Sequence, residues 1–280
     1  MSTVLLVRHG LTAVTGKLLL GWTPGVGLDE RGEAQARAVA ARLARVPLDA
    51  VVSSPLDRCA QTAGHIAAAR PRGAAALEVQ LDDRLGECHY GDWTGQELAT
   101  LAKDPLWKVV QAHPSAITFP GPGGEALRDT QARGVAAVRD WNARLGKDAT
   151  WVACSHGDVI RAIVADALGM HLDMYHRITV DPCSVTVIRY EERRAFALRL
   201  NDLGGAVDDL LPKPKKDDAP AGDADGQSGA DGHSGGQADG QPPGGQQADA
   251  QPAGAGPETD DDDAASDAVV GGGAGVYPRA

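Results

Sequence analysis

The sequence has few of the features that mark secreted, membrane-bound or disulfide-rich proteins. It holds only four cysteines in 280 residues, Cys59, Cys88, Cys154 and Cys183, and their wide spacing fits neither a disulfide framework nor a metal cluster. No apolar run approaches the roughly 20 residues that cross a bilayer. The N-terminus lacks the basic region, apolar core and cleavage site of a secretory signal. We therefore expect a cytoplasmic protein in a reducing compartment, with no membrane partner.

Basic residues are also scarce, and the deficit lies at one end of the chain. The net charge is −11; residues 201–280 hold 16 acidic and 4 basic side chains, which leaves about +1 on the first 200 residues. Nucleic-acid-binding domains normally show a basic face, so no nucleic-acid partner is expected. Residues 204–280 are rich in Gly, Ala, Asp, Gln and Pro, with Tyr277 as the only aromatic side chain. This composition predicts a disordered acidic tail.

The remaining residues, 1–203, alternate between strand-like and helix-like patterns and predict one domain. Short apolar runs predict strands at residues 3–7, 49–53, 77–81, 150–154, 178–180, 184–190 and 196–200. Amphipathic spacing predicts helices near residues 30–46, 55–69, 125–145 and 158–168. The alternation indicates an α/β three-layer sandwich, with a mainly parallel sheet and an antiparallel edge. Residues 82–123 are expected to be an irregular insertion with one or two short helices, which covers the site.

Arg8-His9-Gly10 is the most informative motif, because it directly follows the first predicted strand. Ligands bind beyond the carboxyl ends of strands in open α/β sheets. An imidazole is a nucleophile that titrates near neutral pH, and a guanidinium offers a fixed fork of donors that suits phosphate. The glycine allows a sharp turn of the backbone. The motif therefore indicates a site for an anionic, phosphate-like group.

Three further segments carry candidate residues for the same site. His156 follows a later strand, and Arg58 lies in the first turn of a helix, where a guanidinium is unfavourable unless an anion sits beside it. Glu87 lies in a loop shaped by glycines and a tryptophan. Arg128 and Arg133 begin the long predicted helix and are placed where they could face the site, but solvated helix charges are the usual case and are expected here.

The order of these motifs resembles that of the histidine phosphatase superfamily, in its phosphoglycerate mutase-like branch. The segments that carry the resemblance are Arg8-His9-Gly10, Ser53-Ser54-Pro55 with Arg58 and Gln61-Thr62, Glu87 with Gly91, Trp93 and Gly95, and Ser155-His156-Gly157. Each motif alone is weak, whereas four in this order are specific. The resemblance covers about residues 3–200 and implies a phosphoglycerate mutase-like fold.

The resemblance also implies a role for five residues. His9 would attack phosphorus and become a phosphohistidine, while Arg8, Arg58 and His156 would hold the phosphoryl oxygens. Glu87 would protonate the leaving oxygen and then take a proton from water. Phosphoryl transfer depends on positioning and charge stabilisation, which these cations supply. No metal and no cofactor are expected, since the sequence shows no carboxylate cluster with metal-ligand spacing.

Five other residues are expected to contact the substrate: Thr15, Gly21, Trp22, Tyr90 and Gly157. Thr15 departs from the family pattern, in which an amide side chain often occupies this position. A threonine hydroxyl still offers one hydrogen bond to a phosphate. Trp22 is equally consistent with a packed loop anchor.

The resemblance leaves three functions open. The family's mutases share a basic set after the glutamate, whereas here only Lys103 and Lys108 lie between Glu87 and Glu125. We therefore favour a phosphomonoesterase that acts on a small phosphorylated metabolite. The alternatives are a phosphoglycerate mutase-type phosphomutase and an inactive adaptor that binds a phosphorylated ligand; the sequence leaves the choice between a monomer and a homodimer open.

Overall fold

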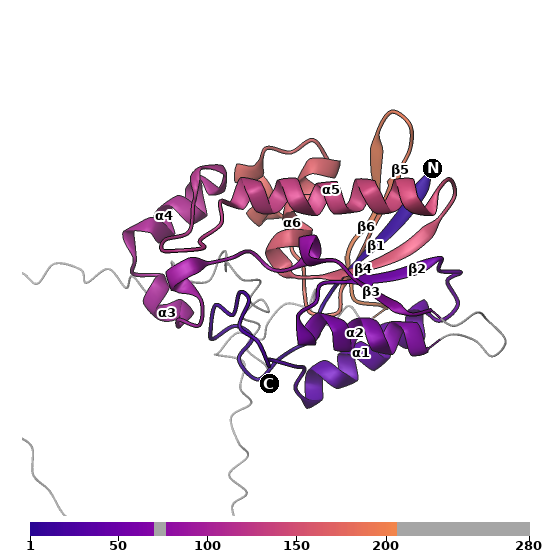
Figure 1. The fold of residues 1–280 in the computed structure, drawn as a ribbon, viewed down its shortest axis with the longest axis horizontal. Helices are drawn as coiled ribbons and strands as arrows, with labels where there is room; N and C mark the ends of the chain where they lie inside the picture. The colour runs from indigo at the N-terminus through magenta and orange to yellow at the C-terminus, as the bar shows by residue number, and fades with distance from the viewer. Residues whose placement is uncertain (70–76, 206–280) are drawn as a thin grey trace, which may run out of the picture. The chain divides into compact units, whose positions relative to one another are not determined.

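A single six-stranded sheet organises the part of the chain that the computed structural model describes, residues 1–69 and 77–205. The acidic tail predicted at 204–280 lies almost wholly outside these residues. The strand order is β3-β2-β4-β1-β5-β6 (Figure 1). The first four strands in this order are parallel to one another, whereas β5 runs antiparallel to both of its neighbours, β1 and β6. The strands are β1 (Ser2–Arg8), β2 (Ala50–Ser53), β3 (Val79–Leu81), β4 (Thr150–Ser155), β5 (Val185–Tyr190) and β6 (Ala195–Asp202).

Helices cover both faces of this sheet. The helices are α1 (Glu30–Leu43), α2 (Asp57–Ala68), α3 (Leu98–Leu101), α4 (Pro105–Ala112), α5 (Leu127–Leu145) and α6 (Gly157–Ala167). Helices α1 and α2 lie on one face, and α5 and α6 lie on the other (Figure 1). Alternate side chains of β1 feed two apolar cores: Leu5 and Val7 pack with α1 and α2, and Val4 and Leu6 pack with α5 and α6. The predicted three-layer α/β sandwich, with its antiparallel edge, is confirmed.

Short elements fill the segment that was predicted to be irregular, residues 82–123. Three 3-10 helices, η1 (Asp83–Leu85), η2 (Gly91–Trp93) and η3 (Pro114–Ala116), accompany α3 and α4. A fourth, η4 (Leu172–Arg177), follows α6. None of the helices in the described residues is long and apolar enough to span a bilayer.

The strand predicted at residues 178–180 is wrong. This short apolar run has no strand partner, because β5 occupies the edge of β1 beside it. Its backbone carbonyls serve two buried guanidinium groups instead. Arg8 donates to the Val180 carbonyl at 2.7 Å, and Arg161 donates to the Ile178 carbonyl at 2.9 Å. Ile178 and Val180 are buried and Thr179 is exposed, and the carbonyls of the two buried residues accept from side chains instead of from a neighbouring strand.

Candidate active site

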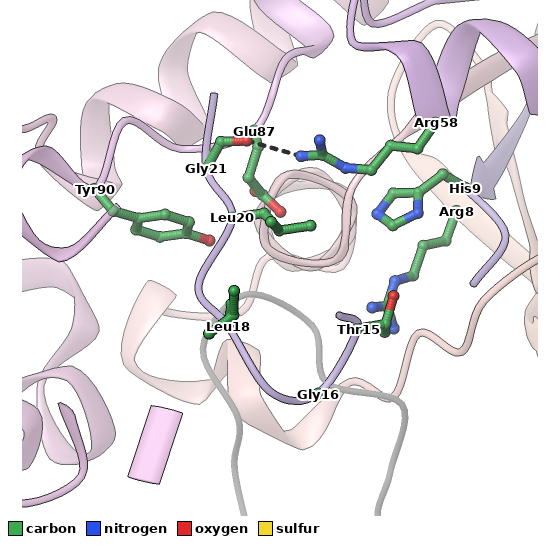
Figure 2. A pocket seen from close by; sticks show the side chains of 10 residues that line it. All are labelled: Arg8, His9, Thr15, Gly16, Leu18, Leu20, Gly21, Arg58, Glu87 and Tyr90. Atoms are coloured by element: carbon green, nitrogen blue, oxygen red, sulfur yellow. Dashed lines mark hydrogen bonds between the residues drawn. The ribbon is translucent and has the colours of Figure 1, made fainter. Parts of the chain in front are cut away.

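The four parallel strands deliver the predicted polar residues to one edge of the sheet (Figure 2). Strand β1 ends at Arg8 and is followed by His9, and β2 leads into α2, which carries Arg58. Strand β4 leads to His156, and β3 leads through η1 to Glu87. All five side chains are at least 95% buried. Because the carboxyl ends of parallel strands share an edge, residues far apart in the sequence meet there. Arg8, His9, Arg58 and Glu87 line one pocket, whereas His156 is fully buried beside it and does not line it.

His9 presents a ring nitrogen with a free electron pair. Its Nδ1 lies 2.7 Å from the Gly10 carbonyl, which can only accept, so Nδ1 carries the proton and Nε2 does not. Burial, and then the charges of Arg58 and Arg8, hold the pKa of His9 well below its usual value. The imidazole is therefore neutral at pH 7. Its ring lies 5.1 Å from that of His156, so the two predicted histidines converge.

Arg8 and Arg58 are buried cations with unused hydrogen-bond donors. Each donates to one backbone carbonyl, Arg8 to Val180 at 2.7 Å and Arg58 to Gly21 at 2.8 Å. Nε of Arg8, and Nε and Nη1 of Arg58, are buried without a partner. Among the ion pairs of the described residues, none joins either guanidinium to a carboxylate. Burying an unpaired cation is costly, so these donors are arranged for an anion that enters the pocket.

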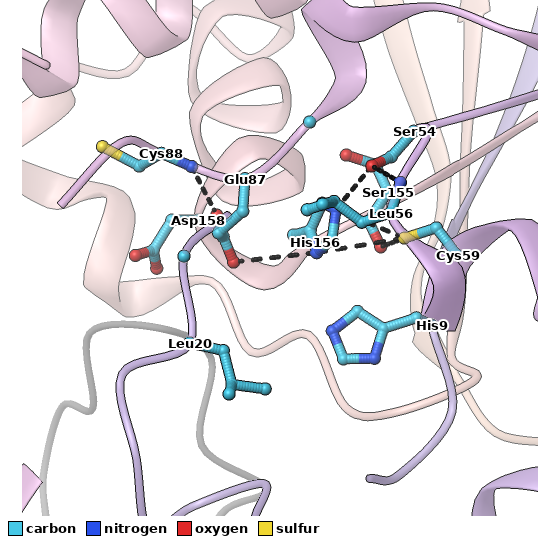
Figure 3. A network of polar contacts seen from close by, with 12 residues as sticks. His9, Leu20, Ser54, Leu56, Cys59, Glu87, Cys88, Ser155, His156 and Asp158 are labelled. Atoms are coloured by element: carbon cyan, nitrogen blue, oxygen red, sulfur yellow. Dashed lines mark hydrogen bonds and ion pairs between the residues drawn. The ribbon is translucent and has the colours of Figure 1, made fainter. Parts of the chain in front are cut away.

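His156 is fully buried and is held by a network of polar contacts (Figure 3). Its Nε2 lies 2.8 Å from Oγ of Ser54 and 3.4 Å from Sγ of Cys59, and its Nδ1 lies 4.0 Å from Oε2 of Glu87. Burial and the charge of Arg58 lower the pKa of His156 well below its usual value. A neutral imidazole fixed in this way donates a hydrogen bond without adding a further charge.

Glu87 is a carboxyl group that holds its proton near neutral pH. Burial, and then the negative charge of Asp158, raise the pKa of Glu87 to about 7. The backbone N–H of Cys88 donates to Oε1 at 3.0 Å. Asp158 itself accepts from the Tyr90 hydroxyl at 2.7 Å. Such an environment suits a group that must donate a proton at neutral pH.

Arg133 anchors the backbone that carries Glu87. Its guanidinium donates to the carbonyls of Arg84 at 2.8 Å, Gly86 at 2.7 Å and Glu87 at 2.9 Å. It also forms an ion pair with Glu125, with a shortest distance of 2.7 Å. The expectation that Arg133 would be a solvated helix charge is therefore wrong. An arginine fork with five donors satisfies several carbonyls of a loop at once.

Three of the residues expected to contact the substrate line the pocket: Thr15, Gly21 and Tyr90 (Figure 2). Thr15 Oγ1 accepts from the backbone N–H of Thr12 at 2.9 Å, which closes the loop after β1. Gly21 has a positive φ of 49°, and its carbonyl accepts from Arg58. These residues line the pocket together with Arg8, His9, Arg58 and Glu87.

The other two expected substrate contacts, Trp22 and Gly157, are not among the residues that line this pocket. The Trp22 ring stacks on His89 with centroids 4.5 Å apart, and its Nε1 donates to the Glu87 carbonyl. Trp22 is thus placed as a loop anchor beside Glu87. Gly157 is buried as the first residue of α6.

Sequence reasoning gave no role to Ser54, Asp158 or Arg133. Ser54 directly follows β2, as His9 follows β1, and this position at the end of a parallel strand could have identified it as a site residue. Asp158 is a carboxylate in the otherwise apolar start of a buried helix, which also marks it as special. Arg133 contacts a loop 46 residues away in the sequence, and no local sequence pattern predicts that contact.

A neutral imidazole with a free Nε2, two buried guanidinium groups with unused donors, and a protonated carboxyl group define a site for phosphoryl transfer to an enzyme side chain. Residues 4–203 match the histidine phosphatase superfamily (branch 1), and the chain belongs to this family. The resemblance seen in the sequence is thereby confirmed.

The chain is similar to curated proteins named for two different activities. The chain is 34% identical over 218 residues to phosphoserine phosphatase 1 of Hydrogenobacter thermophilus, covering 72% of this chain and 92% of that protein. It is 33% identical over 177 residues to a 2,3-bisphosphoglycerate-dependent phosphoglycerate mutase of Brucella melitensis, covering 60% and 82%. Three mycobacterial relatives are 34% identical over 201 residues, and the chain spans about half of their length, 53%.

The fold agrees with these sequence relatives. The crystal structure of a phosphoserine phosphatase from Entamoeba histolytica, in complex with 3-phosphoglyceric acid, superposes with a TM-score of 0.63 at 25% identity. The match covers 75% of this chain and all of that one.

Proposed function

We propose that the chain is a phosphomonoesterase that acts on a small phosphorylated metabolite through a phosphohistidine at His9, with its own cations in place of a metal. The observation that carries the proposal is the set of buried, unpartnered guanidinium donors of Arg8 and Arg58 beside the free Nε2 of His9. A phosphoryl group satisfies these donors and places its phosphorus next to the nucleophile.

In the first step, Nε2 of His9 attacks phosphorus, and the bond between phosphorus and the ester oxygen breaks. The electron pair of that bond goes to the leaving oxygen, which takes the proton of Glu87. Arg8, Arg58 and His156 hold the three remaining phosphoryl oxygens and stabilise their charge. The alcohol leaves, and His9 is a phosphohistidine.

In the second step, water replaces the alcohol. Glu87, now a carboxylate, takes a proton from the water as its oxygen attacks phosphorus. The bond between phosphorus and Nε2 breaks, and its electron pair returns to the imidazole. Inorganic phosphate leaves, and both His9 and Glu87 return to their starting protonation states.

The test is turnover of p-nitrophenyl phosphate in the presence of EDTA, together with denaturation at alkaline pH after exposure to a radiolabelled phosphoester. The intact protein is expected to release phosphate and to retain an acid-labile label. His9→Ala is expected to lose both, with a fall in turnover of at least about 10³-fold. His171→Ala is the matched control, since His171 is 68% exposed. Unchanged turnover by His9→Ala overturns the proposal.

A phosphomutase is the second candidate, favoured by the similarity to the Brucella enzyme. Against it, neither Lys103 nor Lys108, the only cations between Glu87 and Glu125, lines the pocket. Interconversion of 2- and 3-phosphoglycerate faster than release of phosphate from either establishes the mutase. Binding of phosphoesters without turnover establishes the adaptor instead.

A further inference from the structure

We propose that the substrate's alcohol part is an uncharged, apolar group of several carbons, and that it lies in a groove beside the phosphate pocket. This inference rests on the proposed function, because it concerns the leaving group of the same reaction. It separates this chain from relatives named for phosphoserine or phosphoglycerate, whose alcohols are small and charged.

The phosphate pocket is too small for the whole of a metabolite. Its cavity volume is about 20 Å³, whereas a groove next to it has a volume of about 460 Å³. Gly16 and Leu18 line both, so the two adjoin each other. A phosphoester whose phosphorus lies at His9 therefore has its organic part directed toward the groove. Pockets of some 300–1,000 Å³ are the size that holds small organic ligands.

The path between the two spaces is apolar. Leu18 and Leu20 lie on the loop after Gly16 and form one side of the phosphate pocket (Figure 2). No cation lines that pocket other than Arg8 and Arg58, which hold the phosphate in the proposed reaction. A carboxylate close to the ester oxygen thus meets Leu18 and Leu20 on this side, and the uncharged polar side chains of the pocket are Thr15 and Tyr90, whose hydroxyl already donates to Asp158. Leaving a charge without a partner there is costly.

The groove itself carries no net charge. Its side chains are Val14, Leu18, Leu98 and Ala99, with one cation, Lys17, and one anion, Glu97. Both charged residues are exposed, as expected for charges at a rim, whereas Leu18 and Leu98 are half-buried. A polyanionic alcohol would be attracted by Lys17 but repelled by Glu97. An apolar group instead buries the aliphatic surface of the groove.

The test is a series of n-alkyl phosphates from ethyl to octyl, compared with phosphoserine and 3-phosphoglycerate. The leaving alcohols of the alkyl series have nearly equal acidity, so a change in kcat/KM reports binding of the chain. We expect kcat/KM to rise about two- to fourfold per methylene until the groove is filled, and octyl phosphate to exceed both charged substrates at least tenfold.

Two variants place the effect in the groove. Leu98→Ser is expected to lower the octyl-to-ethyl ratio of kcat/KM about tenfold, and this ratio does not depend on how much of the protein is folded. Leu168→Ser, at a residue that is 40% exposed and outside the groove, is the matched control and leaves the ratio unchanged.

This inference is overturned if kcat/KM does not change along the alkyl series. It is also overturned if phosphoserine is turned over faster than the alkyl phosphates and the Lys17→Ala substitution lowers that rate. In either case the proposed phosphatase function is unaffected. Absence of turnover for every phosphoester overturns the proposed function as well.

Discussion

Glu87 and His9 lie in the same buried pocket, and burial shifts their proton affinities in opposite directions. A carboxyl group becomes harder to ionise when it is desolvated, and an imidazole becomes harder to protonate. The result is a protonated Glu87, with a pKa of about 7, facing a neutral His9, whose pKa lies well below its usual value. Desolvation is the largest cause of both shifts, and it favours a protonated acid beside a neutral nucleophile.

Replacement of Glu87 by glutamine is expected to change how the rate depends on pH and on the leaving group. The acid must be protonated, so kcat/KM of the intact enzyme for ethyl phosphate should fall above pH 7 as the carboxyl loses its proton. The leaving group of p-nitrophenyl phosphate is p-nitrophenolate, a stable anion, so cleavage of this ester depends little on a proton from Glu87. We expect Glu87→Gln to lower kcat/KM about 10²- to 10⁴-fold for ethyl phosphate, less for the aryl ester, and to remove the alkaline limb. An equal loss on both substrates contradicts the acid role.

Arg133 is expected to act through the position of Glu87. Methionine at this position fills similar space but leaves the carbonyls of Arg84, Gly86 and Glu87 without their donor. Arg133→Met should therefore lower kcat about tenfold for ethyl phosphate and less for p-nitrophenyl phosphate.

The control for Arg133→Met is Arg128→Met, on the same helix at a residue whose side chain is 65% exposed. In a Glu87→Gln background, Arg133→Met should add little, because residues that act as a unit are not additive. A full additional loss in that background would show that Arg133 serves only the stability of the loop.

At the scale of elements, the site depends on how closely β1 and α1 approach. Gly10 follows His9, and a Cβ on it would lie 2.7 Å from the backbone carbonyl of Gly32, which is in α1. The Cβ would be fixed to the backbone of Gly10, and the carbonyl belongs to the backbone of Gly32, so neither atom can move aside easily. The absence of a side chain at Gly10 sets the position of His9 over the helix.

Gly10→Ala should therefore lower the free energy of unfolding by about 1–3 kcal/mol and reduce turnover, since the loop that carries His9 must shift. Gly64→Ala is the matched change in α2, where a Cβ meets nothing within 4 Å. There the substitution should stabilise the protein by about 0.5–1 kcal/mol, because alanine favours a helix interior. Urea unfolding and p-nitrophenyl phosphate turnover measure both; wild-type stability and turnover in Gly10→Ala would show that the contact is not restrictive.

The elements that the sequence predicts well are those whose pattern and position agree. Strand β1 and helix α1 show clear periodicity, and Arg8 and His9 stand where a strand ends, so both the fold and this part of the site are readable. The run at 178–180 misled because its buried residues, Ile178 and Val180, look the same in sequence whether their backbone pairs with a strand or accepts from a guanidinium group. Arg133 was missed because its partners are carbonyls, which every residue has and no sequence marks.

At the scale of the whole molecule, the described fold and the side chains of the proposed reaction lie within the first 205 residues. The sheet runs from Ser2 to Asp202, and the two apolar cores and the five side chains of the proposed catalytic cluster belong to it or to its connections. The excess of negative charge lies elsewhere, with −12 on residues 201–280. We expect a charge of this size to repel anionic substrates at long range.

A chain that ends at residue 205 should accordingly keep the melting temperature and the kcat of the full protein. Its kcat/KM for anionic phosphoesters should rise by up to about threefold at 10 mM salt, because a repulsive charge is removed, and should equal that of the full chain near 0.3 M salt, where the screening length is only several ångströms. Steady-state kinetics of both chains across this range of salt measure the effect. A loss of kcat on truncation that persists at high salt would mean that the C-terminal residues contribute contacts to the reaction, and the assignment of the whole catalytic unit to residues 1–205 would have to be given up.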